Sequence, residues 1–225
     1  MDDLAKKTIA GFVQFIGALA ILLFVGAWTL DFWQAWVYLA VFAAATLLIT
    51  LHLWKTDPQL LKRRINIGPR AEKEKSQKRI QSAATAAFIG TYLLPALDHR
   101  FSWSRVAVPL IVAGDVLVAL GFFIIFIVFR ENTYSAATVE VAAGQKVIST
   151  GPYAMVRHPM YSGALLIFFA TPLALGSLWG LVIFIPMTLV IVWRLVDEEK
   201  FLLRNLPGYA EYRNKVRRRL LPLVW

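Results

Sequence analysis

The chain lacks several groups on which many active sites depend. It has no cysteine, which excludes a disulfide framework, a thiolate nucleophile and a cysteine-based metal site. Its three histidines, His52, His99 and His158, are far apart and show no ligand spacing, so we expect no metal site. Neither G-x-G-x-x-G nor G-x4-G-K-[ST] occurs. Without these phosphate-binding loops we expect no Rossmann-type domain.

Charged residues are also scarce, and their absence from long stretches indicates a membrane protein. Only 17% of the residues are charged, whereas 58% are hydrophobic. A helix that crosses a bilayer needs roughly 20 apolar residues. The runs Ile9 to Leu30, Trp33 to Trp54 and Val106 to Phe129 reach that length, and Ser82 to Leu97 is a shorter run without charge.

The stretch Gly163 to Trp193 contains no charged residue, and the turn-forming residues from Thr171 to Gly180 divide it into a hairpin of two shorter helices. We therefore predict an all-α fold, a polytopic integral membrane helix bundle of five to six membrane segments. One membrane domain, 1–225, would contain N-terminal helices with a basic loop (1–105, loop 55–81) and a second half, 106–225, that ends in the hairpin.

The positive charges are distributed unevenly about the predicted membrane segments. The formal net charge is +10, and with alternating crossings 22 of the 24 Lys and Arg residues fall on one side. This positive-inside pattern predicts that both termini are cytosolic. It makes membrane lipids the expected partner of the basic surface and gives no support for nucleic acid. The compact size is our reason to expect a prokaryotic inner membrane; the oligomeric state is left open.

Polar clusters flank the hairpin on both sides, within 151–163 and 194–199, so they emerge together and form one composite site. An arginine at the apolar boundary, Arg194, can bind an anionic group, and it is spaced to pair with Glu198 one helical turn later. Arg157 and His158 suit the carboxylate of a small zwitterion. The nearby tyrosines offer faces for a cation or an adenine ring. A sulfonium cofactor with an amino-acid tail would use all of these groups.

Other polar residues have a simpler interpretation. We expect Lys62–Arg64 and Glu72–Lys75 to form a solvated or head-group-contacting face of loop 55–81. An acidic residue within an apolar run, Asp115, is expected near the outer interface, hydrogen-bonded to a neighbour or paired with Arg105.

The pattern G-P-Y-x3-R-H-P-x-Y-x-G followed by R-x3-E-E resembles the isoprenylcysteine carboxyl methyltransferase family. More broadly it is similar to membrane methyltransferases that include phospholipid N-methyltransferases, over about residues 130–225. The resemblance implies that S-adenosylmethionine binds in a cytosolic pocket and that a lipidic or prenylated substrate enters from the bilayer. By motif position, it implies that Arg194 orients the substrate and that Glu198 contacts the cofactor. This chain departs from the family at 145–148, where Gln and Ile replace His and Val.

The motif and the chemistry together define the expected site. The expected catalytic residues are Arg194, Glu199 and Tyr212, the last two as proton acceptors if the acceptor is an amine. The expected cofactor-binding residues are Gln145, Lys146, Val147, Ile148, Tyr153, Arg157, His158, Pro159, Met160, Tyr161, Glu198 and Tyr209. No metal is expected.

We predict methyl transfer to a lipidic acceptor, with a carboxylate such as that of isoprenylcysteine as the first choice. A carboxylate nucleophile is already ionised and needs no general base, so positioning and desolvation would provide the catalysis. A phospholipid amine is the main alternative acceptor. Membrane reductases of the sterol type, which share an R-H-P-x-Y-like segment but use NADPH, are a second class. A scaffold or transporter without catalysis is a third.

Overall fold

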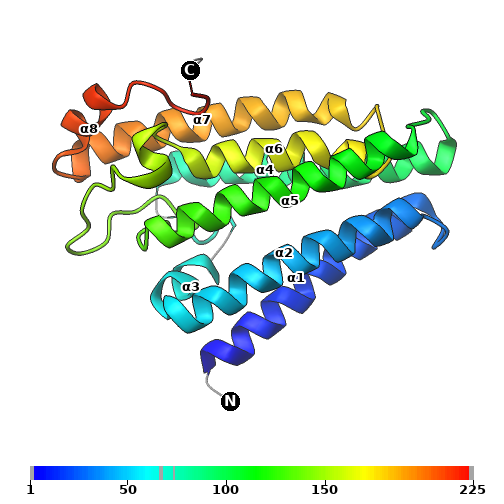
Figure 1. Ribbon diagram of the computed structural model, residues 1–225, viewed down its shortest axis with the longest axis horizontal. Coiled ribbons are helices and arrows are strands. Elements are labelled where there is room, and N and C mark those ends of the chain that lie inside the picture. The colour runs from blue at the N-terminus through cyan, green and yellow to red at the C-terminus, as the bar shows by residue number, and fades with distance from the viewer. Residues whose placement is uncertain (1–2, 66–67, 73, 223–225) are drawn as a thin grey trace.

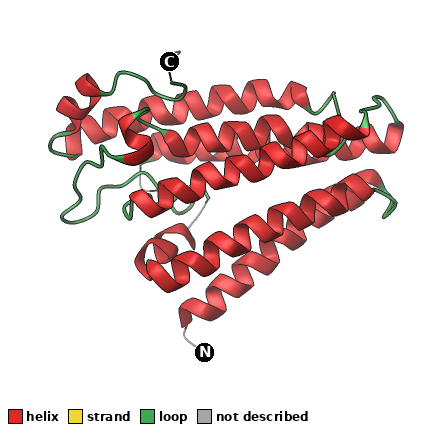
Figure 2. Ribbon diagram, in the orientation of Figure 1, coloured by secondary structure: helices red, strands yellow, loops and turns green. Residues whose placement is uncertain are grey.

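The computed structural model describes residues 3–65, 68–72 and 74–222, and this part of the chain is helical, with loops and no strands (Figure 2). Figure 1 labels the α-helices along the chain, which is coloured from blue at the N-terminus to red at the C-terminus. The helices are α1 (Asp3–Ala27), α2 (Trp33–Thr56), α3 (Pro58–Ile65), α4 (Lys75–Phe101), α5 (Val108–Glu131), the 3-10 helix η1 (Gly151–Ala154), α6 (Pro159–Ala174), α7 (Leu181–Asn205) and α8 (Tyr209–Lys215).

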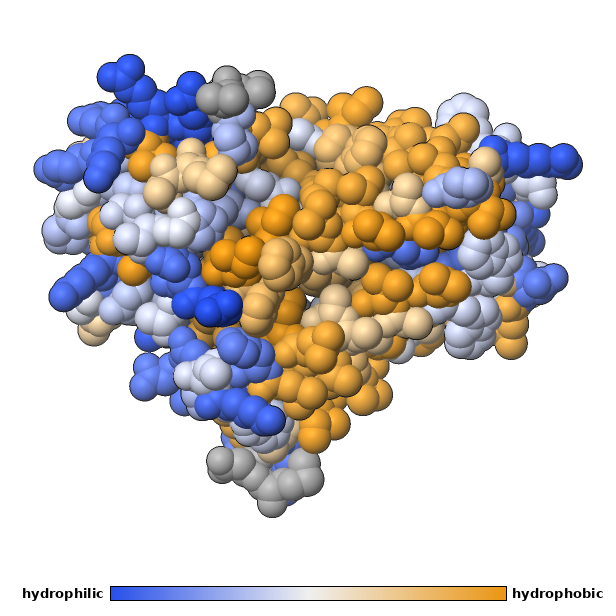
Figure 3. Space-filling view, in the orientation of Figure 1, coloured by the Kyte–Doolittle hydropathy of each residue, from blue (hydrophilic) through white to orange (hydrophobic). Residues whose placement is uncertain are grey.

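Four of these helices, α1, α2, α4 and α5, are long and apolar enough to cross a membrane. The helix α6 is apolar but shorter, and α7 begins with the uncharged stretch 181–193 before its charged second half. A hydrophobic band covers the middle of the molecule between two hydrophilic ends (Figure 3). The prediction of a polytopic membrane helix bundle is confirmed.

The predicted hairpin is α6 and α7, but its turn is shorter than expected. The helix α6 continues through Thr171 and Pro172 to Ala174, so the turn begins only at Leu175. Proline is tolerated there because neighbouring groups in a membrane bundle can satisfy the freed backbone acceptor. The turn itself uses Gly176, whose φ of +72° is accessible to glycine without steric cost.

The hairpin is held against α5 by unusually close backbone packing. A Cβ atom placed on Gly114 would lie 2.5 Å from the backbone nitrogen of Ala174, and one on Gly121 would lie 2.8 Å from the carbonyl oxygen of Gly163. Small residues allow this approach, and close packing is a main source of helix association in membranes. The pair α5 and α6 therefore forms the centre of the bundle, with α4 and α7 beside it and α1 and α2 diverging toward α3 (Figure 1).

One carboxylate fixes the end of the bundle near the α6–α7 turn, which we call the far end. Asp98 is 1% exposed and accepts hydrogen bonds from the backbone N–H and hydroxyl of Ser104 and from the hydroxyl of Ser177. These bonds join the end of α4, the start of the α4–α5 connection and the hairpin turn. They fix the position of the hairpin along the bundle, and hence the level at which α6 begins and α7 ends at the opposite end.

A second acidic residue, Asp115 on α5, is 7% exposed, and its Oδ1 atom has no hydrogen-bond partner. The expected pairing with Arg105 is not formed between these two described residues. Asp115 is buried on α5, one residue after the close contact of Gly114 with α6.

Candidate functional site

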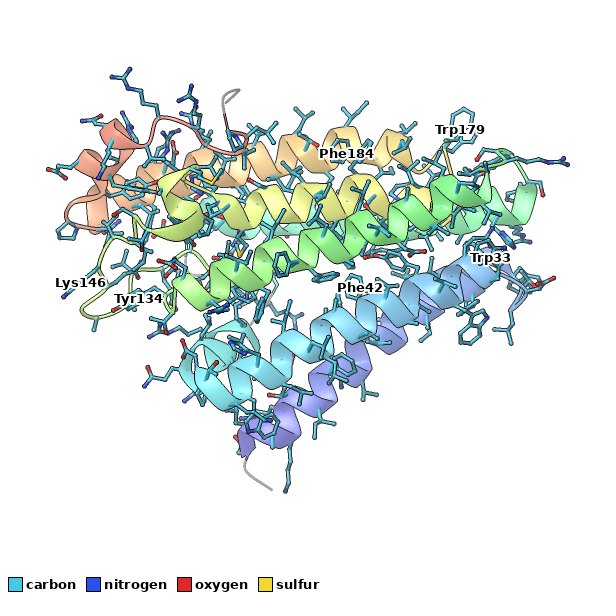
Figure 4. The ribbon with its side chains drawn as sticks, in the orientation of Figure 1. Trp33, Phe42, Tyr134, Lys146, Trp179 and Phe184 are labelled. Atoms are coloured by element: carbon cyan, nitrogen blue, oxygen red, sulfur yellow. The ribbon has the colours of Figure 1, made fainter. Side chains whose placement is uncertain are left out.

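A cavity lies at the opposite end of the bundle, which we call the cavity end. It forms where the α5–α6 connection, the second half of α7 and helix α8 meet. In Figure 4, Tyr134 and Lys146 mark this end, and Trp33 and Trp179 mark the far end. The α5–α6 connection forms one wall through residues between 132 and 148, and Leu202 and Leu206 add apolar surface from the end of α7.

All the predicted site residues line this cavity except Glu199. The two sequence segments that flank the hairpin thus come together in space, as expected. Sequence reasoning missed other wall residues, because nothing in the local pattern of a loop shows which of its residues face inward. The missed residues are Asn132, Tyr134, Ser135, Ala136, Thr138, Val139, Glu140, Leu202 and Leu206.

Glu199 lies behind the wall instead and binds three cationic or potentially cationic groups. Its carboxylate accepts hydrogen bonds from Arg157 Nε at 2.6 Å, from His158 Nε2 at 3.2 Å and from Arg219 Nε at 3.2 Å. Burial alone would raise its pKa, but the hydrogen bonds from His158 and Arg157 outweigh that effect and lower the pKa to about 2. The expectation that Glu199 accepts a proton in the cavity is therefore wrong on position, and we assign it a positioning role.

The same contacts change the interpretation of Arg157. Its guanidinium donates through Nε to Glu199 and through Nη1 to the carbonyl oxygen of Val216 at 2.8 Å. Arg157 and His158 are each 6% exposed, and their backbone N–H groups donate to the carbonyls of Arg218 and Arg219. The C-terminal tail therefore runs beside the start of α6 and holds both residues of the motif at the cavity wall.

Arg194 forms a second network on the other side of the cavity. Its Nε donates to the Tyr161 hydroxyl at 3.0 Å, and that hydroxyl donates to Glu198 Oε2 at 2.6 Å. The predicted contact between Arg194 and Glu198 is thus relayed by Tyr161. The ion pair of Arg194 is instead made with Glu72, whose Oε1 lies 2.8 Å from Nη2.

Glu72 corrects the expectation of a solvated face at Glu72–Lys75. Glu72 is 3% exposed, and its second oxygen accepts the backbone N–H of Val139, a cavity-wall residue, at 3.1 Å. Lys73 lies outside the described residues, whereas Glu74 and Lys75 are exposed as expected. The run of alternating charges carried no signal for this burial, since the partner Arg194 is 122 residues away in the chain.

The start of α4 also contributes to this network. Gln81 accepts a hydrogen bond from Arg194 Nη1 at 2.8 Å. Ser76 and the fully buried Gln77 both donate to Asp197 Oδ2 at 2.8 Å. These bonds join the N-terminal half of the chain to the charged part of α7 and fix the rotation of that helix.

The basic helix α3 is likewise partly turned toward the protein. Arg64 Nη1 donates to the carbonyl of Ala136 at 3.0 Å, and its guanidinium lies 4.7 Å from the ring centre of Phe129. Burial lowers the pKa of Arg64 to about 10. Arg63 donates to the carbonyl of Thr133 at 3.0 Å. The expected solvated face thus applies to Lys62, while the two arginines hold the start of the cavity wall.

Five tyrosines line the cavity, among them Tyr153, Tyr209 and Tyr212. Tyr153 accepts a hydrogen bond from Asn132 at 2.8 Å, and burial raises its pKa to about 12. Tyr212 donates to the carbonyl of Tyr153 at 2.8 Å, and burial raises its pKa further. A hydroxyl that donates and resists ionisation is a poor proton acceptor, which argues against the base role expected for Tyr212. The Tyr209 hydroxyl is buried and has no hydrogen-bond partner among the described residues.

The arrangement suits a mixed polar and aromatic ligand. Tyr209 leaves a hydroxyl available at the cavity, and Glu198 presents a carboxylate that accepts a hydrogen bond from the Tyr161 hydroxyl. Aromatic faces and the α5–α6 connection complete the wall. Within 3–65, 68–72 and 74–222 no group of three or more His, Asp or Glu side chains could hold a metal ion.

Comparison with known families gives one match. Residues 109–207 match the family model for phospholipid methyltransferase. The matched region runs from the start of α5 to just beyond α7 and contains the α5–α6 connection with both predicted motifs. It excludes Glu72 and the α8 tyrosines. A comparison with curated proteins found no match. The family match supports a membrane methyltransferase and leaves the acceptor unidentified.

Proposed function

We propose that this chain is an S-adenosylmethionine-dependent methyltransferase that acts on a lipidic acceptor at the cytosolic face of a membrane. One observation carries the proposal. The cavity is built by the two polar segments that flank the apolar hairpin, and both segments lie in the part of the chain that matches the phospholipid methyltransferase model. A cavity at the end of membrane-length helices can take a polar cofactor from the solvent and an apolar substrate from the bilayer.

The residues at the cavity fit this cofactor. The free hydroxyl of Tyr209 and the carboxylate of Glu198 suit ribose hydroxyls or an ammonium group, and the rings of Tyr153 and Tyr212 suit a base or a cation. His158 and the backbone of 145–148 complete the expected binding surface. When bound, the cofactor would supply an electrophilic methyl group on a positively charged sulfur.

The contacts of Arg194 bear on which acceptor is methylated. The expected first choice, an isoprenylcysteine carboxylate, needed Arg194 as its anion-binding group. Three guanidinium nitrogens of Arg194 already donate to protein oxygens, and its charge is paired with the buried Glu72. This occupancy, together with the matched family, favours an amine of a membrane lipid as the acceptor.

An amine acceptor requires a group that takes its proton. Glu199 is bound to Arg157, His158 and Arg219 behind the wall, and the Tyr212 hydroxyl donates to Tyr153. Glu198 is the carboxylate of the two that faces the cavity. We therefore assign the proton-accepting role to Glu198, with Tyr161 orienting it at 2.6 Å.

A reductase of the sterol type is less well supported. The additional phosphate of NADPH would favour cationic groups, but the wall contains Glu198, and of its lysines and arginines, Arg157 and Arg194 are paired with buried glutamates, which leaves Lys146. A scaffold or transporter gives no reason for a buried, unpartnered tyrosine hydroxyl beside a cavity.

Calorimetric titration of the detergent-purified protein with S-adenosylhomocysteine, with NADPH in parallel, tests the proposal. We expect binding of the first ligand alone. We expect His158→Ala and Glu198→Ala each to weaken it by about 10-fold, the loss of one good polar contact. Glu211→Ala, at an exposed position of α8, is the matched control and should bind normally. Binding of NADPH alone, or of neither ligand, would overturn the assignment.

A further inference from the structure

The connection between α3 and α4 places one buried carboxylate, that of Glu72, beside the cavity wall. This connection lies outside the residues that match the family model. Glu72 is 3% exposed and is bound at both oxygens: Oε1 pairs with Arg194 Nη2 at 2.8 Å, and Oε2 accepts the N–H of Val139 at 3.1 Å. Both partners line the cavity, whereas Glu72 itself does not. Glu72 can therefore affect the ligand only through Arg194 and through the position of the wall.

The charge of Arg194 is already compensated within the protein. One guanidinium lies among two carboxylates, since Glu72 pairs with it directly and Glu198 is joined to it through the Tyr161 hydroxyl. Of these two carboxylates, Glu198 is the one that reaches the cavity. An anionic acceptor beside Glu198 would meet a like charge, whereas an ammonium group would be attracted.

The hydrogen bonds of Arg194 support the same conclusion. Nε donates to Tyr161, Nη1 to Gln81, and Nη2 to both Glu72 and the carbonyl of Ala137. A carboxylate from a substrate would have to displace one of these acceptors. Displacing Glu72 would leave a buried charge without its partner, which is strongly unfavourable.

We propose that Glu72 is a positioning residue that sets the charge preference of the acceptor end of the cavity, so that a lipid amine is methylated in preference to a lipid carboxylate. It neutralises Arg194 and leaves Glu198 as the group that the acceptor meets. This inference rests on the proposed methyltransferase function. In the transfer, the lone pair of the neutral nitrogen forms the N–CH3 bond as the S–CH3 bond breaks. The bond electrons stay on sulfur, which becomes a neutral thioether, and the proton lost from nitrogen passes to Glu198.

The test is a competition between two acceptors in the same vesicles, phosphatidylethanolamine and N-acetyl-S-farnesylcysteine, with radiolabelled S-adenosylmethionine. We expect wild type to methylate the amine lipid faster. Glu72→Gln keeps the shape of the side chain and removes its charge, so the ratio of amine to carboxylate methylation should fall by about 10-fold. Glu74→Gln, two residues away and exposed, is the matched control and should keep the wild-type ratio.

A double variant separates charge from structure. Glu72→Gln combined with Arg194→Gln removes one charge of each sign, so the sum of the charges returns to its wild-type value. We expect the preference for the amine to return in this variant, even if its rate is low. If Glu72 only supports the fold, the double variant should be no closer to the wild-type ratio than the single variant is.

Several results would overturn the proposal. These are a wild-type preference for the carboxylate, an unchanged ratio in Glu72→Gln, a double variant that keeps the altered ratio, and a lack of methylation of both acceptors by a protein that binds S-adenosylhomocysteine. Failure of the underlying methyltransferase function would look different, since S-adenosylhomocysteine would then not bind at all.

Discussion

The two ends of the bundle both bury carboxylates, and they surround them with different partners. At the far end, Asp98 receives hydrogen bonds from two serine hydroxyls and one backbone N–H. At the cavity end, Glu72 and Glu199 are bound by arginines, and His158 adds a further contact. The far end uses neutral donors from two segments, the α4–α5 connection and the hairpin turn, whereas the cavity end uses charged side chains from distant parts of the chain.

We interpret the bonds at the far end as support for the fold and the pairs at the cavity end as support for a binding site. The two Asp98 oxygens are each bound, and their bonds join α4 to the hairpin turn. At the cavity end the pairs hold a wall, and groups such as the Tyr209 hydroxyl remain without a protein partner. Buried polar groups are ordinarily bound by protein or by ordered water, so a hydroxyl beside a cavity with no partner among the described residues is free to bind a ligand.

Removal of Glu199 should have the largest effect on stability. Glu199→Ala leaves Arg157 and His158 buried without their acceptor, and we expect the free energy of unfolding in detergent to fall by about 3–5 kcal/mol. Affinity for S-adenosylhomocysteine should fall as well, because the wall loses its support. Denaturant titration and calorimetry measure the two losses, with Glu211→Ala as an exposed control. A loss below about 1 kcal/mol would mean that the cluster does not hold the wall.

The same residue gives the cavity end a pH dependence. Glu199 lies on α7 beyond the apolar stretch 181–193, and its pKa of about 2 is below the ordinary value of 4.5. Its contribution to stability is therefore fully present above about pH 4.5 and is lost as the pH falls toward 2. We expect the stability difference between wild type and Glu199→Ala to shrink over that range. A difference that stays constant would contradict the pairing.

Replacement of Asp98 should cause the next largest loss of stability and should leave ligand affinity almost unchanged. Asp98→Ala removes hydrogen bonds to a charged group, worth about 2 kcal/mol of unfolding free energy. The affinity for S-adenosylhomocysteine should stay within a factor of about 2, because the far end takes no part in binding. Asp31→Ala, at an exposed position, is the control. A marked loss of affinity in Asp98→Ala would show that the two ends are coupled.

Tyr209→Phe should have a smaller effect with the opposite signature. The hydroxyl has no protein partner, so its removal should leave stability unchanged or raise it by up to about 1 kcal/mol. Affinity for S-adenosylhomocysteine should fall by about 10-fold if the hydroxyl binds the ligand. Tyr212→Phe is the contrast, because it loses the bond to Tyr153 and should cost about 1 kcal/mol of stability. Unchanged affinity in Tyr209→Phe would remove this residue from the site.

The smallest effect is expected at Asp115. The Oδ1 atom has no hydrogen-bond partner, so Asp115→Asn breaks no bond at that atom and changes the side chain very little in size. Methyl transfer and expression should match wild type, and stability should stay within about 0.5 kcal/mol. A variant that folds normally but loses activity would show that this membrane carboxylate takes part in function.

The membrane helices could be predicted from the sequence because length and apolar composition are local properties. The hairpin and the meeting of its flanking segments followed from the same information. Glu72 could not be predicted, since an E-K-E-K run has the composition of a solvated face and its partner, Arg194, is distant in the chain. Glu199 was placed in the cavity beside Glu198, but successive residues on a helix point about 100° apart. Glu198 therefore faces the cavity, whereas Glu199 lies behind its wall.

The close contact of α5 with α6 has a consequence for how this site can be altered. The wall loop starts at the end of α5 and finishes at the start of α6, and Gly114, Gly121 and Gly163 leave no room for either helix to shift. Both anchor points of the loop are thus fixed in space. Residues 132–158 are therefore joined at both ends to a close-packed pair of helices, and any segment exchanged for them would also have to keep their contacts with Arg64, Glu72 and the C-terminal tail.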